Sequence, residues 1–112
     1  TNTLQCLLLA FSMVESSHNY QAIGDKGAAF GAYQFHKSRW IEMSGKESDW
    51  GKANKAEQDR VMTKFIVWGL KQAENKKVDP IIFLTNTHNI GHHVGKETKY
   101  TAKIRKELKK CN

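Results

Sequence analysis

The feature that most constrains this chain is the helical spacing of its apolar residues. The first seventeen residues contain neither glycine nor proline. Large apolar side chains recur there every three or four residues, which places them on one face of a helix. These side chains are Leu4, Leu7, Leu8, Phe11 and Val14. The spacing therefore predicts an amphipathic helix at the start of the chain.

Similar spacing, with helix start and stop signals, predicts four more helices, at about 32–43, 55–75, 81–88 and 97–110. Pro80 suits the first helical position, with Asp79 as the N-cap. The glycine-bearing stretch 16–31 disfavours a helix and allows a short hairpin within 17–29. We therefore predict an all-α fold, or α with a minor β hairpin, of about five helices in a single domain over residues 1–112.

The size and composition are those of a small soluble globular domain. A chain of 112 residues can bury one hydrophobic core and is too short for two domains. Its 39% hydrophobic and 26% charged residues exclude a disordered or fibrous chain. The longest apolar run, residues 6–11, is far shorter than the roughly 18 residues of a membrane helix.

The chain is basic, with a formal net charge of +7. Its natural partners are therefore polyanions, such as nucleic acid, an acidic membrane face or an anionic cell wall. A basic cluster near the C-terminus could bind nucleic acid, but we favour a solvated helix face whose cations suit the helix dipole. The cluster consists of Lys103, Arg105, Lys106, Lys109 and Lys110.

The two cysteines, Cys6 and Cys111, lie near opposite ends of the sequence. They are compatible with a disulfide, which would contribute about 4–5 kcal/mol in the loop-entropy model, and equally with two buried thiols. The first residue, Thr1, fits a processed or excised domain, and no basic segment precedes the apolar stretch as in a signal peptide.

Glu15 is a carboxylate in an unexpected place. It is the only charged residue among the first 24, and it continues the stripe of Leu8 and Phe11. This position predicts a carboxyl group at the border between the core and a cleft. Burial and the negative end of the helix dipole both raise a carboxyl pKa, as a general acid requires. The alternative is that Glu15 has a structural role, as a cap or as a bridge to Tyr100 or to a loop amide.

Asp25 is the second candidate carboxylate. It lies in the turn sequence Gly24-Asp25-Lys26-Gly27, ten residues after Glu15. Glycoside hydrolysis commonly uses a protonated acid together with an ionised carboxylate. An exposed loop would keep Asp25 ionised beside a protonated Glu15. The alternative is an ordinary Asp-Lys turn beside glycine.

Six short motifs follow one another along the chain. They are Val14-Glu15-Ser16-Ser17, Gly24-Asp25, Gly31-Ala32-Tyr33-Gln34-Phe35, Trp40-Ile41-Glu42, Thr87-His88-Asn89-Ile90-Gly91 and Glu97-Thr98-Lys99-Tyr100. Their order resembles that of the lysozyme superfamily. Within it, the pattern is most similar to the invertebrate-type (destabilase) lysozymes. It also has features of goose-type lysozymes and lytic transglycosylases.

The resemblance implies a lysozyme-like helical domain and a role for each matched residue. Glu15 would be the general acid and Asp25 the second carboxylate. Tyr33 and Gln34 would line the floor of a glycan cleft. Substrate contacts would come from His88 and Asn89, and Tyr100 would lie near the Glu15 carboxyl group.

Three departures from the family patterns stand out. Two cysteines are few for an invertebrate-type lysozyme. His88 replaces the tyrosine of the goose-type and transglycosylase motif, and His36 lies near the place where goose-type enzymes carry an aspartate.

Other signals support weaker hypotheses. His88, His92 and His93 suggest zinc, but there is no H-E-x-x-H motif, so we expect no metal and no cofactor. No G-x-S-x-G elbow supports a serine nucleophile, although destabilase-like relatives suggest a secondary isopeptidase activity. Trp68 continues the apolar line of the long helix and is predicted to be core, whereas Trp50 could stack on a sugar.

We therefore predict a secreted or extracytoplasmic, monomeric muramidase. It would cleave the β-1,4 bond between N-acetylmuramic acid and N-acetylglucosamine in bacterial peptidoglycan, and would bind neither nucleic acid nor membrane. The alternatives are a lytic transglycosylase with Glu15 as the sole acid and base, or a glycan-binding module without catalysis.

Overall fold

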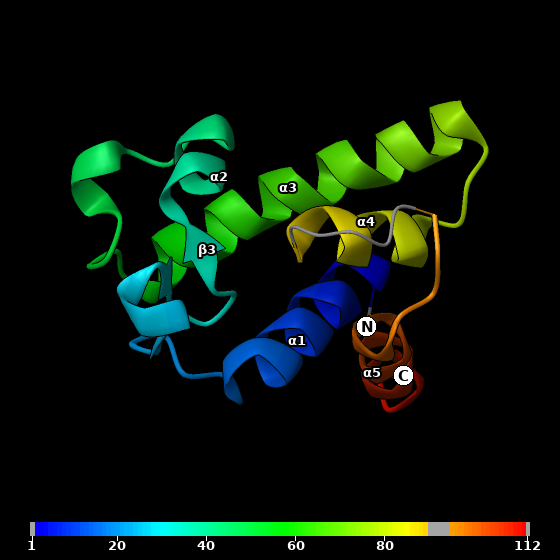
Figure 1. The fold of residues 1–112 in the computed structure, drawn as a ribbon, viewed down its shortest axis with the longest axis horizontal. Helices are drawn as coiled ribbons and strands as arrows, with labels where there is room; N and C mark the ends of the chain where they lie inside the picture. The colour runs from blue at the N-terminus through cyan, green and yellow to red at the C-terminus, as the bar shows by residue number, and fades with distance from the viewer. Residues whose placement is uncertain (1, 90–94, 112) are drawn as a thin grey trace.

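The computed structural model describes residues 2–89 and 95–111 and shows a mostly helical protein with a small antiparallel sheet (Figure 1). Its α-helices, within these residues, are α1 (Thr3–Ser16), α2 (Lys37–Glu42), α3 (Lys55–Lys76), α4 (Pro80–His88) and α5 (Lys99–Lys109). The strands are β1 (Ile23–Gly24), β2 (Ala29–Phe30) and β3 (Phe35–His36), and the short 3₁₀ turns are η1 (Asp25–Gly27) and η2 (Glu47–Asp49).

Local start signals explain where most helices begin. The Asn2 side chain accepts from the backbone N–H of Gln5, and Asn54 caps α3 in the same way. Asp79 caps α4, and Pro80 occupies its first turn, as predicted. Thr98 caps α5 in a capping box with Thr101, so this helix begins two residues later than the apolar spacing suggested.

The helix predicted over 32–43 is wrong at its start. Residues 31–34 form a turn in which Gln34 has φ 54°, and Phe35 and His36 pair with β2. Only residues 37–42 are helical. The short hairpin allowed within 17–29 is present as β1 and β2, which extends to residue 30, and β3 adds a third strand in the order β1-β2-β3.

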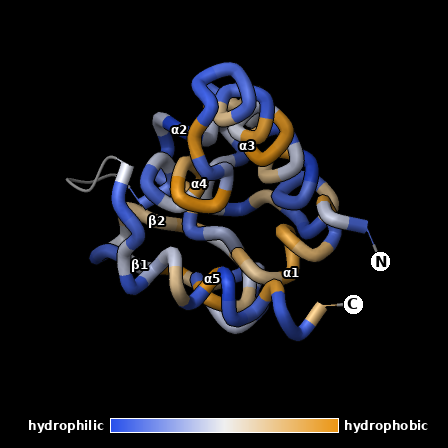
Figure 2. The backbone as a smooth tube through the Cα atoms, turned by 90° about the vertical axis from the view of Figure 1, so that its right-hand side faces the viewer, coloured by the Kyte–Doolittle hydropathy of each residue, from blue (hydrophilic) through white to orange (hydrophobic). Residues whose placement is uncertain are grey.

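The core lies where α1, α3, α4 and α5 meet, and it extends to β3 and α2. In Figure 1, α3 crosses the top of the molecule, and α1 contacts both α3 and α5. In Figure 2, the residues of α1 are largely hydrophobic, whereas hydrophilic and hydrophobic residues alternate along α5. Such alternation is expected for a helix with one buried face. The largest fully buried side chains include Phe11, Phe35, Trp40, Phe65, Leu84 and Ile104. Burying one such side chain contributes about 1.5–3 kcal/mol.

The prediction that Trp68 belongs to the core is wrong. Its side chain is 37% exposed and packs against Phe65 and Phe83. The core side of α3 is instead completed by Gly69, where a Cβ would lie 2.3 Å from Leu84 Cδ2. This small residue allows α4 to approach α3 closely.

The two ends of the chain are joined covalently. Cys6 in α1 and Cys111 after α5 form a disulfide with their Cα atoms 5.7 Å apart. The structure thus resolves the open choice between a disulfide and two thiols. None of the helices within residues 2–89 and 95–111 has the length and apolar character needed to cross a membrane.

Candidate active site

Glu15 lies in the last turn of α1, and its side chain is 21% exposed. The helix ends there because Ser17 adopts the left-handed conformation, and the Ser16 hydroxyl donates to the Ala32 carbonyl at 2.8 Å. The chain thereby folds back over the end of α1. From the other side, the Tyr100 hydroxyl donates a short hydrogen bond to Glu15 Oε2.

Burial raises the pKa of the Glu15 carboxyl group above its usual range. The Tyr100 hydrogen bond opposes this shift because it stabilises the ionised form. The negative charge of Asp25 raises the pKa further, and His36 lowers it. The net direction is upward, so Glu15 retains its proton to higher pH than a solvated glutamate, as a proton donor requires.

His88 forms a neutral wall beside Glu15. Its Nε2 lies 2.6 Å from the Tyr33 carbonyl oxygen, so this nitrogen carries the hydrogen. Burial among aromatic rings lowers the His88 pKa to about 4. Although Nε2 is 3.8 Å from Glu15 Oε2, a neutral imidazole forms no ion pair at neutral pH. The side chain is only 3% exposed, so His88 has little surface for a sugar.

Asp25 is the exposed counterpart of Glu15. It lies in η1 with φ 49°, and its side chain is 67% exposed. Oδ2 lies 2.9 Å from His36 Nε2. Because β2 and β3 pair Ala29 with His36, the hairpin delivers His36 to this position. His36 was not among the predicted site residues; the available signal was its position near the place where goose-type enzymes carry an aspartate.

Glu15 and Asp25 line the same open pocket, which has a volume of about 370 Å³. Its other lining residues are Gly24, Gln34, His36, His88 and Asn89. The structure thus brings five of the seven predicted site residues to one pocket.

Gln34 forms a fixed part of the pocket wall. Its Nε2 donates to the carbonyls of Gly31 at 2.8 Å and Ala22 at 3.3 Å. Its Oε1 packs against Gly24, where a Cβ would lie only 2.1 Å away. Gly24 therefore makes room for the amide. Asn89, which follows the last residue of α4, is exposed and lines the pocket.

The other two predicted residues, Tyr33 and Tyr100, do not line this pocket. Tyr100 is beside Glu15, as expected from the resemblance. The Tyr33 hydroxyl instead donates to Asp59 Oδ1 at 2.6 Å, and its ring lines a different pocket with Tyr20 and Lys55. Only the Tyr33 backbone carbonyl reaches the Glu15 side, through His88.

Within the described residues, no three His, Cys, Asp or Glu side chains gather as a metal site would require. Of the three histidines considered for zinc, His92 and His93 lie outside the described residues, as do Ile90 and Gly91 of the last motif but one.

The comparisons with known proteins add no assignment. No protein-family model, curated protein or solved structure matches the chain. The site itself combines a sheltered carboxyl group, an exposed carboxyl group and further polar groups on one open pocket.

Proposed function

We propose that this protein is a muramidase of the lysozyme type, acting on the β-1,4 bond between N-acetylmuramic acid and N-acetylglucosamine in peptidoglycan. The observation that carries the proposal is the pairing of a sheltered Glu15 with an exposed Asp25 on one pocket. Two carboxyl groups in such different surroundings suit the two roles of glycoside hydrolysis.

In this mechanism, Glu15 donates its proton to the oxygen of the leaving sugar. Asp25 then attacks the anomeric carbon or activates a water molecule. Asn89 supplies an amide group for the hydroxyl and N-acetyl groups of the sugars. The Gln34 amide hydrogens already bind the Gly31 and Ala22 carbonyls, so Gln34 contributes its Oε1 as an acceptor.

Two properties of the whole chain support the assignment. The net charge of +7 favours accumulation on an anionic wall. The Cys6–Cys111 disulfide is typical of proteins in oxidising, extracytoplasmic compartments, where peptidoglycan is found. We propose that the protein acts there as a monomer and without a cofactor.

One observation favours a lytic transglycosylase as the second candidate. Asp25 is largely exposed and already paired with His36, whereas Glu15 is sheltered. A single acid that later acts as a base would release an anhydro-sugar without the addition of water. Mass spectrometry of the products released by the purified protein distinguishes the two reactions, because hydrolysis adds the mass of one water molecule and transglycosylation does not.

The decisive experiment compares the wild-type protein with Glu15→Gln in clearing a suspension of bacterial walls. We expect Glu15→Gln to lose at least about a hundredfold in rate, as for removal of a general acid. Glu74→Gln, which removes an exposed carboxylate on α3, serves as the matched control and should clear normally. Normal clearing by Glu15→Gln would refute the assignment.

Asp25→Asn distinguishes the two candidates. A muramidase that uses both carboxyl groups loses most of its rate in this variant. A transglycosylase that relies on Glu15 alone retains most of its rate and yields anhydro products. If wild type and Glu15→Gln both bind walls and neither cleaves them, the chain is a glycan-binding module.

A further inference from the structure

The positive charge of this protein is concentrated at one end of the chain. Residues 95–112 contain seven of the 18 Lys and Arg residues but only two of the 11 acidic ones. This segment, with α5 at its centre, therefore supplies most of the net charge of +7.

The charge is arranged on one side of α5. The buried side of the helix contributes Thr101 and Ile104 to the core. Apart from Ala102, every exposed position within α5 is a lysine. We call these residues, Lys99, Lys103, Lys106 and Lys109, the lysine face. At about 1.5 Å per residue, the face is about 15 Å long.

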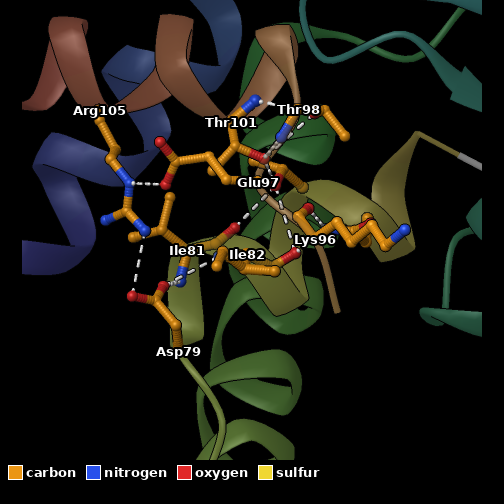
Figure 3. A network of polar contacts seen from close by, with 10 residues as sticks. Asp79, Ile81, Ile82, Lys96, Glu97, Thr98, Thr101 and Arg105 are labelled. Atoms are coloured by element: carbon orange, nitrogen blue, oxygen red, sulfur yellow. Dashed lines mark hydrogen bonds and ion pairs between the residues drawn. The ribbon is translucent and has the colours of Figure 1, made fainter. Parts of the chain in front are cut away.

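Within the described residues, the lysine face has no internal partners. Among the ion pairs and hydrogen bonds of residues 2–89 and 95–111, none involves the ammonium group of any of its four lysines. Arg105 behaves differently: its guanidinium group contacts Glu97 at 2.7 Å and Asp79 at 3.0 Å (Figure 3). Arg105 thus fixes α5 to the start of α4, and the lysines remain available.

The lysine face begins beside the candidate active site. Asn89 lines the Glu15 pocket and also a second hollow of about 430 Å³, whose walls include Lys96, Lys99 and Tyr100. Tyr100 is also the hydrogen-bond donor to Glu15. In Figure 3 the Lys96 ammonium group points away from the Arg105 network. A polymer leaving the pocket past Asn89 therefore meets Lys96 and Lys99 first.

The side chains on this face favour one kind of polyanion. The face carries no aromatic ring for stacking on bases and no large apolar side chain for entering a membrane. Its compact ammonium charges suit flexible phosphodiesters, which need no planar recognition. We propose that the lysine face binds a phosphate-bearing polymer attached to the glycan in the cleft, as in walls carrying polyol-phosphate chains. This inference rests on the proposed function and deepens it.

The test removes the four charges of the lysine face as Lys99→Gln, Lys103→Gln, Lys106→Gln and Lys109→Gln in one variant. The matched control removes four other exposed lysines as Lys52→Gln, Lys71→Gln, Lys76→Gln and Lys77→Gln. Both variants lose the same net charge. Circular dichroism and thermal unfolding verify that both remain folded.

Binding is measured by co-sedimentation with purified walls that carry the phosphate polymer, and with the same walls after acid extraction of the polymer. On intact walls at low salt, we expect the lysine-face variant to bind about tenfold more weakly than wild type, and the control within about twofold. On extracted walls all three proteins should bind alike. Cleavage of a short soluble oligosaccharide should be unchanged in both variants.

An equal loss in the control variant would overturn the proposal, because net charge alone would then explain the binding. It would also fail if extracted walls bound the wild type as well as intact walls do. A short DNA duplex that competes as well as the phosphate polymer would identify nucleic acid as the partner instead.

The wall-binding readout is independent of catalysis. If Glu15→Gln sediments normally with intact walls and does not cleave, both proposals stand. If the wild type does not cleave the soluble oligosaccharide, the proposed function fails while the binding comparison still decides the role of the lysine face.

Discussion

Two carboxylates in this molecule are held by tyrosine hydroxyl groups, yet their protonation is shifted in opposite directions. Glu15 accepts from Tyr100, and its pKa is raised. Asp59 Oδ1 accepts from Tyr20 and Tyr33, both at 2.6 Å, and its pKa is lowered.

The difference comes from the balance between burial and the polar and charged groups around each carboxyl group. Burial opposes ionisation at both sites. At Asp59 this is outweighed by the Lys55 ammonium group, 2.7 Å from Oδ2, and by the two hydroxyl groups. Glu15 has one hydroxyl group, a neutral His88 and the negative charge of Asp25 nearby. One tyrosine hydrogen bond therefore does not offset the effect of burial on the Glu15 pKa, whereas two such bonds and a lysine outweigh it at Asp59.

The two sites consequently have different roles in stability. A carboxyl group with a lowered pKa stabilises the fold above its unfolded pKa, and this contribution is lost as the pH falls through the folded pKa. A raised pKa has the opposite sign, so the stability contributed by Glu15 is lost as the pH rises through its folded pKa. Asp59 therefore stabilises the fold in its ionised form, whereas burial disfavours the ionised form of Glu15.

The largest effect on stability is expected at Asp59. Asp59→Asn should lower the free energy of unfolding by about 2–3 kcal/mol at neutral pH, since two tyrosine hydroxyl groups and Lys55 lose a charged acceptor. Denaturant unfolding across a pH series measures this loss. The difference from wild type should shrink in acid, where Asp59 is protonated in both states. A pH-independent difference would contradict the assigned role of the charge.

A smaller effect is expected for Tyr33→Phe, which removes one of the hydrogen bonds to Asp59. We expect a loss of about 1 kcal/mol in unfolding free energy. Cleavage of a soluble oligosaccharide should be unchanged, because the Tyr33 side chain lies outside the Glu15 pocket. A large loss of activity with intact stability would restore the prediction that Tyr33 forms the floor of the glycan cleft.

The most subtle effect is expected for Tyr100→Phe. The Tyr100 hydrogen bond favours the ionised form of Glu15, so removing it raises the Glu15 pKa further. If Glu15 is the general acid, the alkaline limb of the pH–rate profile then moves to higher pH. A shift to lower pH would show that Tyr100 acts in another way.

Local patterns in the sequence were sufficient to predict most of the helices and the position of Glu15 at the edge of the core. Asp79 followed by Pro80 fixes the start of α4, because cap and proline act within a few residues. Glu15 could be predicted at the edge of the core because a lone charge on an apolar stripe has few other places to lie. In both cases the decisive neighbours are close in sequence.

The direction of Tyr33 and the exposure of Trp68 depend on distant partners. Tyr33 turns toward Asp59, 26 residues away, while its neighbour Gln34 turns toward Gly24. No periodicity distinguishes these two directions in a turn. Trp68 lies on the predicted apolar line, but its packing partner is Phe83 on α4, which leaves part of the ring in solvent.

The Cys6–Cys111 disulfide makes a covalent ring of the residues between its two cysteines. A protease that cuts once within this ring, for example in the loop 43–54 before α3, opens the ring without dividing the molecule. Both resulting pieces remain joined through the sulfur atoms, so α5 and its lysines stay tethered to α1. Only a second cut within the ring releases a fragment.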